Sequence, residues 1–377
     1  MVEVMCTSIR RSSRTFRRLF GRWFLKFLAV LCVGGVLGSA LSFPPEVVQA
    51  VASPVKIFPL PAAPFDIKVG GGNRIWFTLP EANQIGSLEV IASGPITQHL
   101  YTFYSLSTPN SQPYRLAVDS NYVWFTQKRG NRIGRLSIND GVITEYTVPT
   151  PASEPTGIDV APDGRVWFVE SKGDKVAVLT PSSGAIQEID VGYSGTELDR
   201  IDATSASIIW MTAPGIEMLL GYRLVFNDFV PILIVDTRPD AGPQAVRGLS
   251  ATSSGVPWIS TKELPKVASY QYGTLAIWIW QTYPVENADL VDIVLWNQSG
   301  NTLLWTLDAV NREVLLIDAG TMRLVQRVRL GADDSILTAL AFDPVTQVVW
   351  IADAGRPALY AVEPPYTLRV HLPFVAG

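Results

Sequence analysis

Seven tryptophans recur along the chain at intervals of 43 to 48 residues. They are Trp76, Trp124, Trp167, Trp210, Trp258, Trp305 and Trp350. A repeat of about 40–50 residues is typical of the four-stranded blades of a β-propeller. A single blade cannot bury both of its apolar faces, so blades stack around a common axis. The spacing predicts an all-β fold, a seven-bladed β-propeller over residues 55–377, with each of these tryptophans packed between neighbouring blades.

The clearest repeat unit is EPTGIDVAPDGRVWFVESKGDKVAVLTPSSGAIQEIDV, residues 154–191. Four alternating segments, TGIDV, RVWFVE, KVAVLT and AIQEIDV, predict four strands. Pro162-Asp163-Gly164 and Ser183-Gly184 supply the turn residues between them. Residues 262–272, KELPKVASYQY, lack this pattern. They predict an irregular loop and a contact site.

The phase of the repeat also predicts how the ring closes. Residues 54–65, PVKIFPLPAAPF, resemble an outermost strand followed by entry into the next blade. We therefore expect strand 55–60 to pair with the final blade near residues 358–363. Residues 367–374, TLRVHLPF, also alternate, but Pro364 and Pro365 before them cannot donate backbone hydrogen bonds. We expect that segment to be a C-terminal tail.

The N-terminus resembles an export leader. Residues 1–22 are basic and would stay in the cytoplasm, residues 23–43 are apolar, and residues 44–54 form a linker or cleavage region. The apolar run fits either the core of a signal peptide or a helical transmembrane anchor, and both alternatives stay open. Both place the propeller outside the cytoplasm, at the cell envelope, anchored or secreted. Both cysteines, Cys6 and Cys32, lie in the leader, so the propeller is expected to contain no disulfide.

The charge balance argues against nucleic acid as a partner. Seven of the 30 Lys and Arg residues and one of the 34 Asp and Glu residues lie within the first 26 positions, which leaves a net charge of −10 on the remainder. Nucleic-acid-binding domains carry a basic patch on their folded part. We expect a monomer that binds a protein, a glycan or a small molecule.

The repeat is similar to that of the virginiamycin B lyase family. The resemblance is strongest over residues 112–151 and 154–191, including Asn131-Arg132-Ile133-Gly134-Arg135-Leu136. The fourth to sixth blades match in spacing only. Blade motifs of this kind specify architecture better than activity, because many propellers with unrelated roles share them.

The resemblance implies an elimination that opens a cyclic depsipeptide, with a magnesium ion, a catalytic histidine and nearby glutamates. The family's histidine at the start of the last blade falls within Ile336-Leu337-Thr338-Ala339-Leu340, where no histidine stands. A second expected histidine falls near Val291, and the companion glutamate near Asp353. Proton transfer at neutral pH favours a group with a pKa near 7, and these positions supply none. The sequence therefore predicts no lyase activity by that mechanism.

Two carboxylates remain as metal candidates. Glu154-Pro155-Thr156-Gly157-Ile158 followed by Glu170 retains part of the family pattern, with Thr156 at the histidine position. Glu170 and Asp353 could hold Mg²⁺ or Ca²⁺ through oxygen ligands, although Glu170 also fits an ordinary consensus residue at a strand end. The residues three after each repeat tryptophan could line one rim, and they are Leu79, Gln127, Glu170, Ala213, Thr261, Asp308 and Asp353. The candidate ligand-binding residues are Glu154, Thr156, Gln127, Asp308 and Thr338.

Two functions follow from these patterns. The first is a non-catalytic binding scaffold at the cell envelope, without a catalytic residue or an organic cofactor. The second is a metal-dependent lyase or hydrolase with an altered active site.

Overall fold

The computed structural model describes residues 55–363, apart from residues 72–73, 94–95, 206–207, 226–227, 237–245, 263–265, 273–277, 285–286, 299–300 and 332–333. The predictions for the leader, residues 1–54, and for the tail, residues 367–377, lie outside the described residues. Within the described part, no helix has the length and apolar character needed to cross a bilayer.

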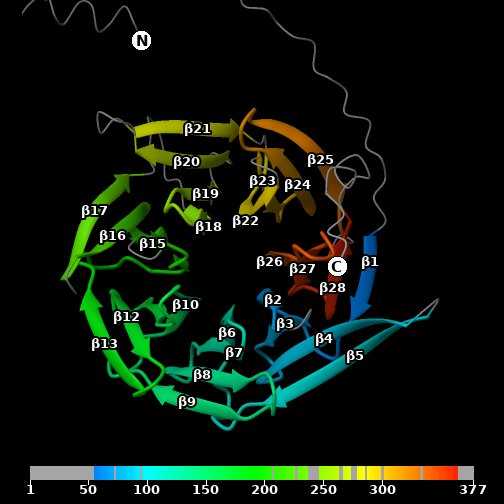
Figure 1. The fold of residues 1–377 in the computed structure, drawn as a ribbon, viewed down its shortest axis with the longest axis horizontal. Coiled ribbons are helices and arrows are strands. Elements are labelled where there is room, and N and C mark those ends of the chain that lie inside the picture. Colours follow the sequence, from blue (N-terminus) through cyan, green and yellow to red (C-terminus); the bar gives the residue numbers. More distant parts are fainter. Residues whose placement is uncertain are drawn as a thin grey trace, which may run out of the picture. The chain divides into compact units, whose positions relative to one another are not determined.

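Seven four-stranded antiparallel sheets are arranged around a central axis (Figure 1), as the tryptophan period predicts. Blade 1 contains β2 (Ile67–Gly70), β3 (Arg74–Leu79), β4 (Gln84–Ser93) and β5 (Ile96–Ser105). Blade 2 contains β6 (Pro113–Val118), β7 (Tyr122–Gln127), β8 (Arg132–Ser137) and β9 (Ile143–Thr147). Blade 3 contains β10 (Pro155–Val160), β11 (Val166–Glu170), β12 (Lys175–Thr180) and β13 (Ala185–Asp190). Blade 4 contains β14 (Ile201–Asp202), β15 (Ile208–Ala213), β16 (Met218–Val225) and β17 (Asp228–Asp236).

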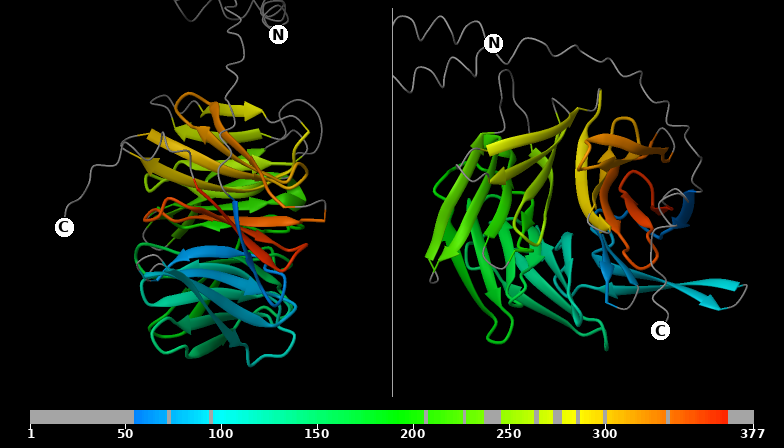
Figure 2. Two further views of the ribbon diagram at one scale, coloured as in Figure 1. Left: turned by 90° about the vertical axis from the view of Figure 1, so that its right-hand side faces the viewer. Right: turned by 45° about the horizontal axis from the view of Figure 1, so that its top comes forward.

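The remaining blades have the same order from the axis outward. Blade 5 contains β18 (Val246–Ala251), β19 (Pro257–Thr261), β20 (Lys266–Tyr272) and β21 (Trp278–Pro284). Blade 6 contains β22 (Leu290–Gln298), β23 (Asn301–Asp308), β24 (Glu313–Asp318) and β25 (Arg323–Arg329). Blade 7 contains β26 (Leu337–Phe342), β27 (Val349–Asp353), β28 (Ala358–Val362) and, from the other end of the domain, β1 (Val55–Pro59). The views in Figure 2 show the blades stacked side by side around the ring.

The seven repeat tryptophans lie on the second strand of each blade and are at most 4% exposed. The apolar clusters that contain them cross from one blade to the next. Trp124 of blade 2, for example, packs with Val166 and Phe168 of blade 3. The predicted packing between blades is confirmed.

The ring closes as predicted. β1 pairs antiparallel with β28, from Val55 opposite Val362 to Pro59 opposite Ala358. Phe58 and Leu60 are buried at this seam, and Phe58 contacts Trp350 with ring centroids 4.9 Å apart. The first described strand is therefore the outer strand of the last blade.

The prediction of an irregular loop over residues 262–272 is wrong for residues 266–272, and residues 263–265 lie outside the described part. Lys266–Tyr272 forms β20, which pairs with β19 on one side and with β21 on the other. The polar side chains that obscured its alternation belong to a strand inside the blade, where two neighbours satisfy the backbone.

Candidate functional site

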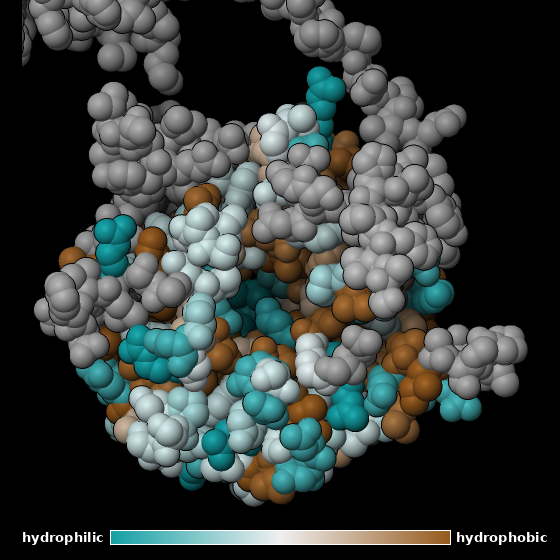
Figure 3. Space-filling view, viewed as in Figure 1, coloured by the Kyte–Doolittle hydropathy of each residue, from teal (hydrophilic) through white to brown (hydrophobic). Residues whose placement is uncertain are grey.

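A pocket of about 580 Å³ opens on the axis of the ring at one face. Figure 3 shows this hollow, with hydrophilic residues at its floor and hydrophobic residues on its right-hand wall. The pocket is formed where the chain enters each inner strand and by loops between the second and third strands of several blades. Its volume falls within the range of about 300–1,000 Å³ that is usual for small-molecule sites.

One residue from every blade lines this pocket. In each blade, one residue of the inner strand pairs with the repeat tryptophan, and the pocket residue lies three positions before it. We call these seven the mouth ring: Phe65, Tyr114, Thr156, Asp199, Arg247, Val291 and Thr338. The pocket is therefore built from an equivalent position of the repeat, with a different side chain in each blade.

A register shift at the start of five inner strands turns these residues toward the axis. It lies in β6, β10, β18, β22 and β26. A bulge of this kind re-aims side chains and leaves a backbone group unpaired. In blade 2 the hydroxyl of Thr126 accepts the N–H of Arg115 at 3.1 Å and donates to the carbonyl of Thr156 in blade 3 at 2.7 Å. The hydroxyl thus ties the bulge to the next blade.

The residue that follows each mouth-ring residue forms a second layer, here called the axial ring. Its members are Asp66, Arg115, Gly157, Arg200, Gly248, Asp292 and Ala339. Arg115 Nη2 donates to Asp199 Oδ2 at 2.7 Å, and Arg200 Nε lies 3.7 Å from the same oxygen. Arg200 Nη1 lies 3.2 Å from Asp292 Oδ1. Blades 2, 4 and 6 are thereby joined across the axis.

These ion pairs divide the axial space in two. Below them lies a smaller cavity of about 190 Å³, and both Arg115 and Arg200 line it as well as the mouth pocket. The side chains of the two arginines are 7% and 9% exposed. The arginines therefore form the floor of the mouth pocket.

The electrostatics of the floor follow from burial and from the shared carboxylate. Burial raises the pKa of Asp199, but the guanidinium groups of Arg115 and Arg200 outweigh it and hold that pKa below its ordinary value. Burial likewise opposes the charge of Arg115, yet Asp199 and the other nearby acidic groups raise its pKa above the ordinary value. Both arginine and aspartate are accordingly ionised at the floor.

The walls of the mouth pocket are of two kinds. Phe65 and Tyr114 stack with ring centroids 4.3 Å apart, and Arg115 and Lys128 lie over the Tyr114 ring at 5.2 and 4.8 Å. The wall formed by blades 6 and 7 carries four apolar side chains beside Asp289 and Thr338, and the most exposed of them is Ile336, at 59%.

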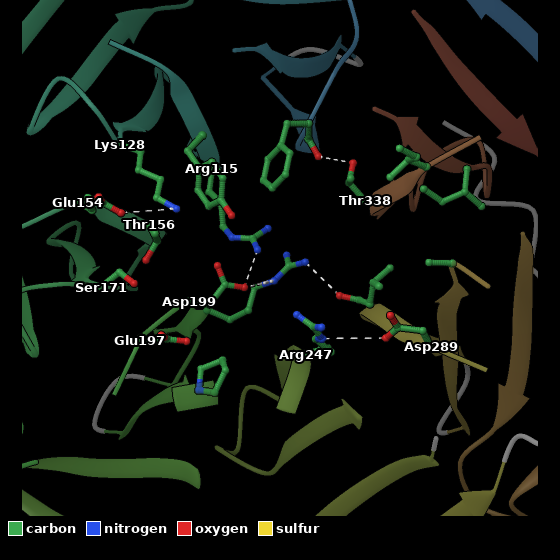
Figure 4. Close-up of a pocket in the computed structure, with 18 of the residues that line it drawn as sticks. Arg115, Lys128, Glu154, Thr156, Ser171, Glu197, Asp199, Arg247, Asp289 and Thr338 are labelled. Atoms are coloured by element: carbon green, nitrogen blue, oxygen red, sulfur yellow. Dashed lines mark hydrogen bonds and ion pairs between the residues drawn. The ribbon is translucent and has the colours of Figure 1, made fainter. Parts of the chain in front are cut away.

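Three of the sequence-predicted ligand-binding residues line this pocket: Glu154, Thr156 and Thr338. Glu154 forms ion pairs with Lys172 and, at 3.8 Å, with Lys128. The Thr156 hydroxyl donates to the carbonyl of Leu198 at 2.7 Å. The Thr338 hydroxyl donates to the carbonyl of Phe65 at 2.6 Å, which links blade 7 to blade 1 (Figure 4).

The residues three after each tryptophan do not form a rim. All seven are fully buried: Leu79, Gln127, Glu170, Ala213, Thr261, Asp308 and Asp353. Successive strand residues point to opposite sides, so the next position faces the pocket instead. Lys128, Ser171, Pro214 and Ala309 occupy that next position and line it.

Gln127 and Asp308 serve the local structure of their blades. Gln127 Nε2 donates to Glu145 at 3.1 Å. Asp308 Oδ1 accepts the backbone N–H groups of Asp289, Val310 and Asn311 at 3.1–3.2 Å.

The two candidate metal ligands lie in different blades. Glu170 ends β11 in blade 3, and burial raises its pKa to about 7. Asp353 ends β27 in blade 7, where Oδ1 accepts three backbone N–H groups and Oδ2 accepts the Tyr360 hydroxyl at 3.1 Å. Across the described ranges, no group of three or more His, Cys, Asp or Glu residues is arranged to hold a metal ion. Mg²⁺ or Ca²⁺ binding at Glu170 and Asp353 stays a prediction.

The described histidine does not reach the pocket. His99 lies on β5 at the outside of blade 1, where its ring meets Phe58 edge-on with centroids 4.9 Å apart. Val291 and Thr338, the positions at which the family resemblance implies histidines, are both members of the mouth ring.

Sequence reasoning missed the floor and most of the mouth ring. Arg115, Asp199, Arg200 and Arg247 follow no motif of their own. The mouth-ring residues lie three positions before the inner-strand residue that pairs with each tryptophan. That pairing, and the bulges beside it, are known only from the structure.

Comparisons with known proteins agree with this architecture. The virginiamycin B lyase family matches residues 50–219. A sequence search of curated proteins finds no match.

Three of the solved structures that match the chain illustrate the shared fold. A selenomethionine-substituted virginiamycin B lyase from Staphylococcus aureus is 20% identical with a TM-score of 0.69, over 83% of this chain and 99% of that one. A streptogramin B lyase is 23% identical with a TM-score of 0.70, over 82% of this chain and 97% of that one. A catalytically inactive S. aureus virginiamycin B lyase with quinupristin is 20% identical with a TM-score of 0.69, over 83% of this chain and 99% of that one. The chain is thus a seven-bladed β-propeller, similar to the virginiamycin B lyase family over residues 50–219 and to solved virginiamycin B and streptogramin B lyases in its fold.

Proposed function

We propose that the protein is a non-catalytic binding scaffold, exported to the cell envelope, whose mouth pocket holds a ligand. One observation carries this proposal. The pocket is present, but Val291 and Thr338 stand where the family resemblance implies histidines. Neither side chain transfers protons at neutral pH.

The solved structure of an inactive S. aureus lyase with quinupristin supports the idea that propellers of this shape hold ligands without turnover. The pocket here contains charged groups at its floor and apolar groups on one wall. Those are the features that orient a small molecule or a short exposed segment of a larger partner.

The test uses a panel of glycans, envelope proteins and small molecules with wild type and two variants. Ile336→Trp adds bulk at the apolar wall. Val345→Trp is the matched control, because Val345 is 69% exposed in the turn between β26 and β27, at the other end of the inner strand. We expect at least one ligand that binds wild type and Val345→Trp but not Ile336→Trp. The proposal would be contradicted if no ligand of the panel binds wild type, or if every ligand that binds wild type binds Ile336→Trp equally well.

The alternative function is a metal-dependent lyase or hydrolase. The observation in its favour is Glu170, whose buried carboxylate oxygens have no hydrogen-bond partner. If this function is correct, Mg²⁺ or Ca²⁺ raises the melting temperature of wild type and has no effect on Glu170→Ala. If millimolar Mg²⁺ and Ca²⁺ leave the melting temperature of wild type unchanged, the metal-dependent function is excluded.

Export is tested separately. We expect the protein in the membrane or secreted fraction, and N-terminal sequencing there distinguishes a cleaved signal peptide from a retained anchor. Recovery in the cytoplasmic fraction alone would contradict export.

A further inference from the structure

We propose that the ligand of the mouth pocket is a small organic anion, a carboxylate attached to an apolar body, bound by Arg115 and Arg247. This inference rests on the proposed binding function and names its ligand class.

The first support is a buried guanidinium with donors to spare. The Arg115 side chain is 7% exposed, and its Nε and Nη1 atoms have no hydrogen-bond acceptor. Nη2 donates to Asp199, whereas Asp66 Oδ1 lies 3.8 Å from Nη1. A buried donor left without an acceptor is energetically unfavourable. Arg115 lines the pocket, so a carboxylate at the floor would reach these buried donors after a small shift of the side chains around them.

A second guanidinium approaches the same space from the opposite side. Figure 4 shows Arg247 and Arg115 directed toward the centre of the pocket from different blades. Arg247 Nε is buried without an acceptor, and its ion pair with Asp289 Oδ1 spans 4.0 Å. Arginine's planar fork matches a carboxylate better than it matches a single oxygen. The Arg247 side chain is 38% exposed and lines the pocket, so its guanidinium is available to a ligand.

The pocket lining carries one more cationic than anionic side chain, while Asp66 and Asp292 pair with the floor arginines from below. Arg115, Lys128, Lys172, Arg200 and Arg247 face four carboxylates, those of Glu154, Glu197, Asp199 and Asp289. Two of these carboxylates are each shared by two cations. Asp199 forms ion pairs with Arg115 and Arg200. Glu154 forms ion pairs with Lys128 and Lys172. Burial also raises the pKa of Asp289 above its ordinary value.

The rest of the ligand is expected to be apolar. Ile336 is 59% exposed at the pocket wall, beside Val291 and Leu337. On the other side, the stacked Phe65 and Tyr114 rings present an aromatic surface. A ligand with its carboxylate at the floor would place an aromatic or aliphatic body between these walls.

Calorimetry with two acids and their neutral amides tests the ligand class. The probes are benzoate and hexanoate, with benzamide and hexanamide as controls of the same shape. We expect both acids, or one of them, to bind at least 10-fold more tightly than the matching amide. Equal affinity for acid and amide, or no binding of either acid at millimolar concentration, would overturn the proposal.

Two variants test the residues. Arg247→Gln should weaken acid binding at least 10-fold. Arg165→Gln is the matched control, because Arg165 pairs with Asp163 in the turn before β11 and does not line the pocket. Circular dichroism verifies that both variants are folded. Undiminished acid binding by folded Arg247→Gln would also overturn the proposal.

The outcome separates this inference from the binding function itself. If neutral or cationic ligands bind and Ile336→Trp excludes them while both acids fail, the scaffold function stands and the anion inference falls. If no ligand of any class binds, both fall.

Discussion

Arg115 in blade 2 and Asp199 at the entry to blade 4 lie 2.7 Å apart, Nη2 to Oδ2, although 84 residues and the whole of blade 3 separate them in sequence. The axial-ring position of blade 3 is Gly157. A Cβ atom at Gly157 would lie 2.6 Å from the carbonyl oxygen of Asp199 and 2.9 Å from the backbone nitrogen of Ile201. The absent side chain lets blade 4 approach closely at this point.

Replacement of Asp199 by Asn should destabilise the propeller by about 3 kcal/mol, because two nearly buried arginines lose a shared counter-charge. The measurement is equilibrium unfolding in urea. Asp163→Asn is the control, since its pair with Arg165 is largely exposed, and exposed pairs contribute about 0–1 kcal/mol. Equal effects of the two substitutions would show that the axial pairs contribute no more than surface ones.

Gly157→Ala should lower the free energy of unfolding by about 1–3 kcal/mol, because the new methyl group meets backbone rather than a movable side chain. Gly320→Ala is the control, since its closest neighbour would be a side-chain oxygen of Asp318 at 3.4 Å. Thermal melting of both variants and of wild type measures the two losses of stability. An unchanged Gly157→Ala protein would mean that blades 3 and 4 can separate without cost.

Glu170 should make the stability depend on pH. A glutamate in the unfolded chain has a pKa of about 4.3, whereas burial raises the pKa of native Glu170 to about 7. The native state therefore retains a proton that the unfolded chain has released, and stability falls as pH rises from about 4.3 to about 7. Glu170→Gln should remove this decline and be more stable than wild type above pH 7, by about 1–3 kcal/mol.

Urea unfolding of both proteins between pH 4 and 8.5 measures this difference. The two curves should converge at the acid end, where the carboxyl is protonated in both states. Parallel curves would show that Glu170 ionises normally in the fold.

Removal of the closing strand should be far more harmful than removal of the C-terminal tail. Deletion of residues 53–61 eliminates β1, its five pairs with β28 and the buried Phe58 and Leu60. We expect the melting temperature to fall by more than about 10 °C, given that 1 kcal/mol corresponds to a few degrees in a domain of this size. Deletion of residues 367–377 is the comparison and should shift it by at most a few degrees. The reverse order would mean that β1 does not hold the ring closed.

No ring opening of a cyclic depsipeptide is expected, because Val291 and Thr338 at the mouth cannot transfer a proton. Chromatography of the peptide after incubation with the purified protein and Mg²⁺ separates the cyclic from the opened form. Appearance of the opened form, proportional to protein and abolished by chelation, would contradict this and restore the lyase alternative.

The blade repeat could be predicted because one large residue per blade must be buried at one place, and a single tryptophan marks that place. The closing strand was predictable for the same reason: its phase relative to the tryptophans was intact. The loop assigned to residues 262–272 failed because polar side chains concealed strand alternation, while β20 is fixed by its two neighbours.

The site was harder to predict because it depends on register. Glu154, Thr156 and Thr338 were found, but Glu170 lies one position before Ser171, which faces the pocket, and neither Asp353 nor its neighbours line the pocket. Arg115 and Arg247 reach the mouth through bulges at Pro113/Leu116 and Val246/Leu249. A bulge adds one residue to one strand, and a count along the sequence does not reveal which strand received it.

The seam between β1 and β28 has a consequence for the order of events during synthesis. Lys56 and Glu363, which face each other across it at 3.2 Å, are 307 residues apart. At about 5–20 residues per second, a ribosome needs about 15–60 s to travel from one to the other. Throughout that interval β1 has been made but β28 has not, so Phe58 cannot yet be buried at the seam. β1 is the first of the described strands to be synthesised, and it can pair only after β28, the last of them, has been made.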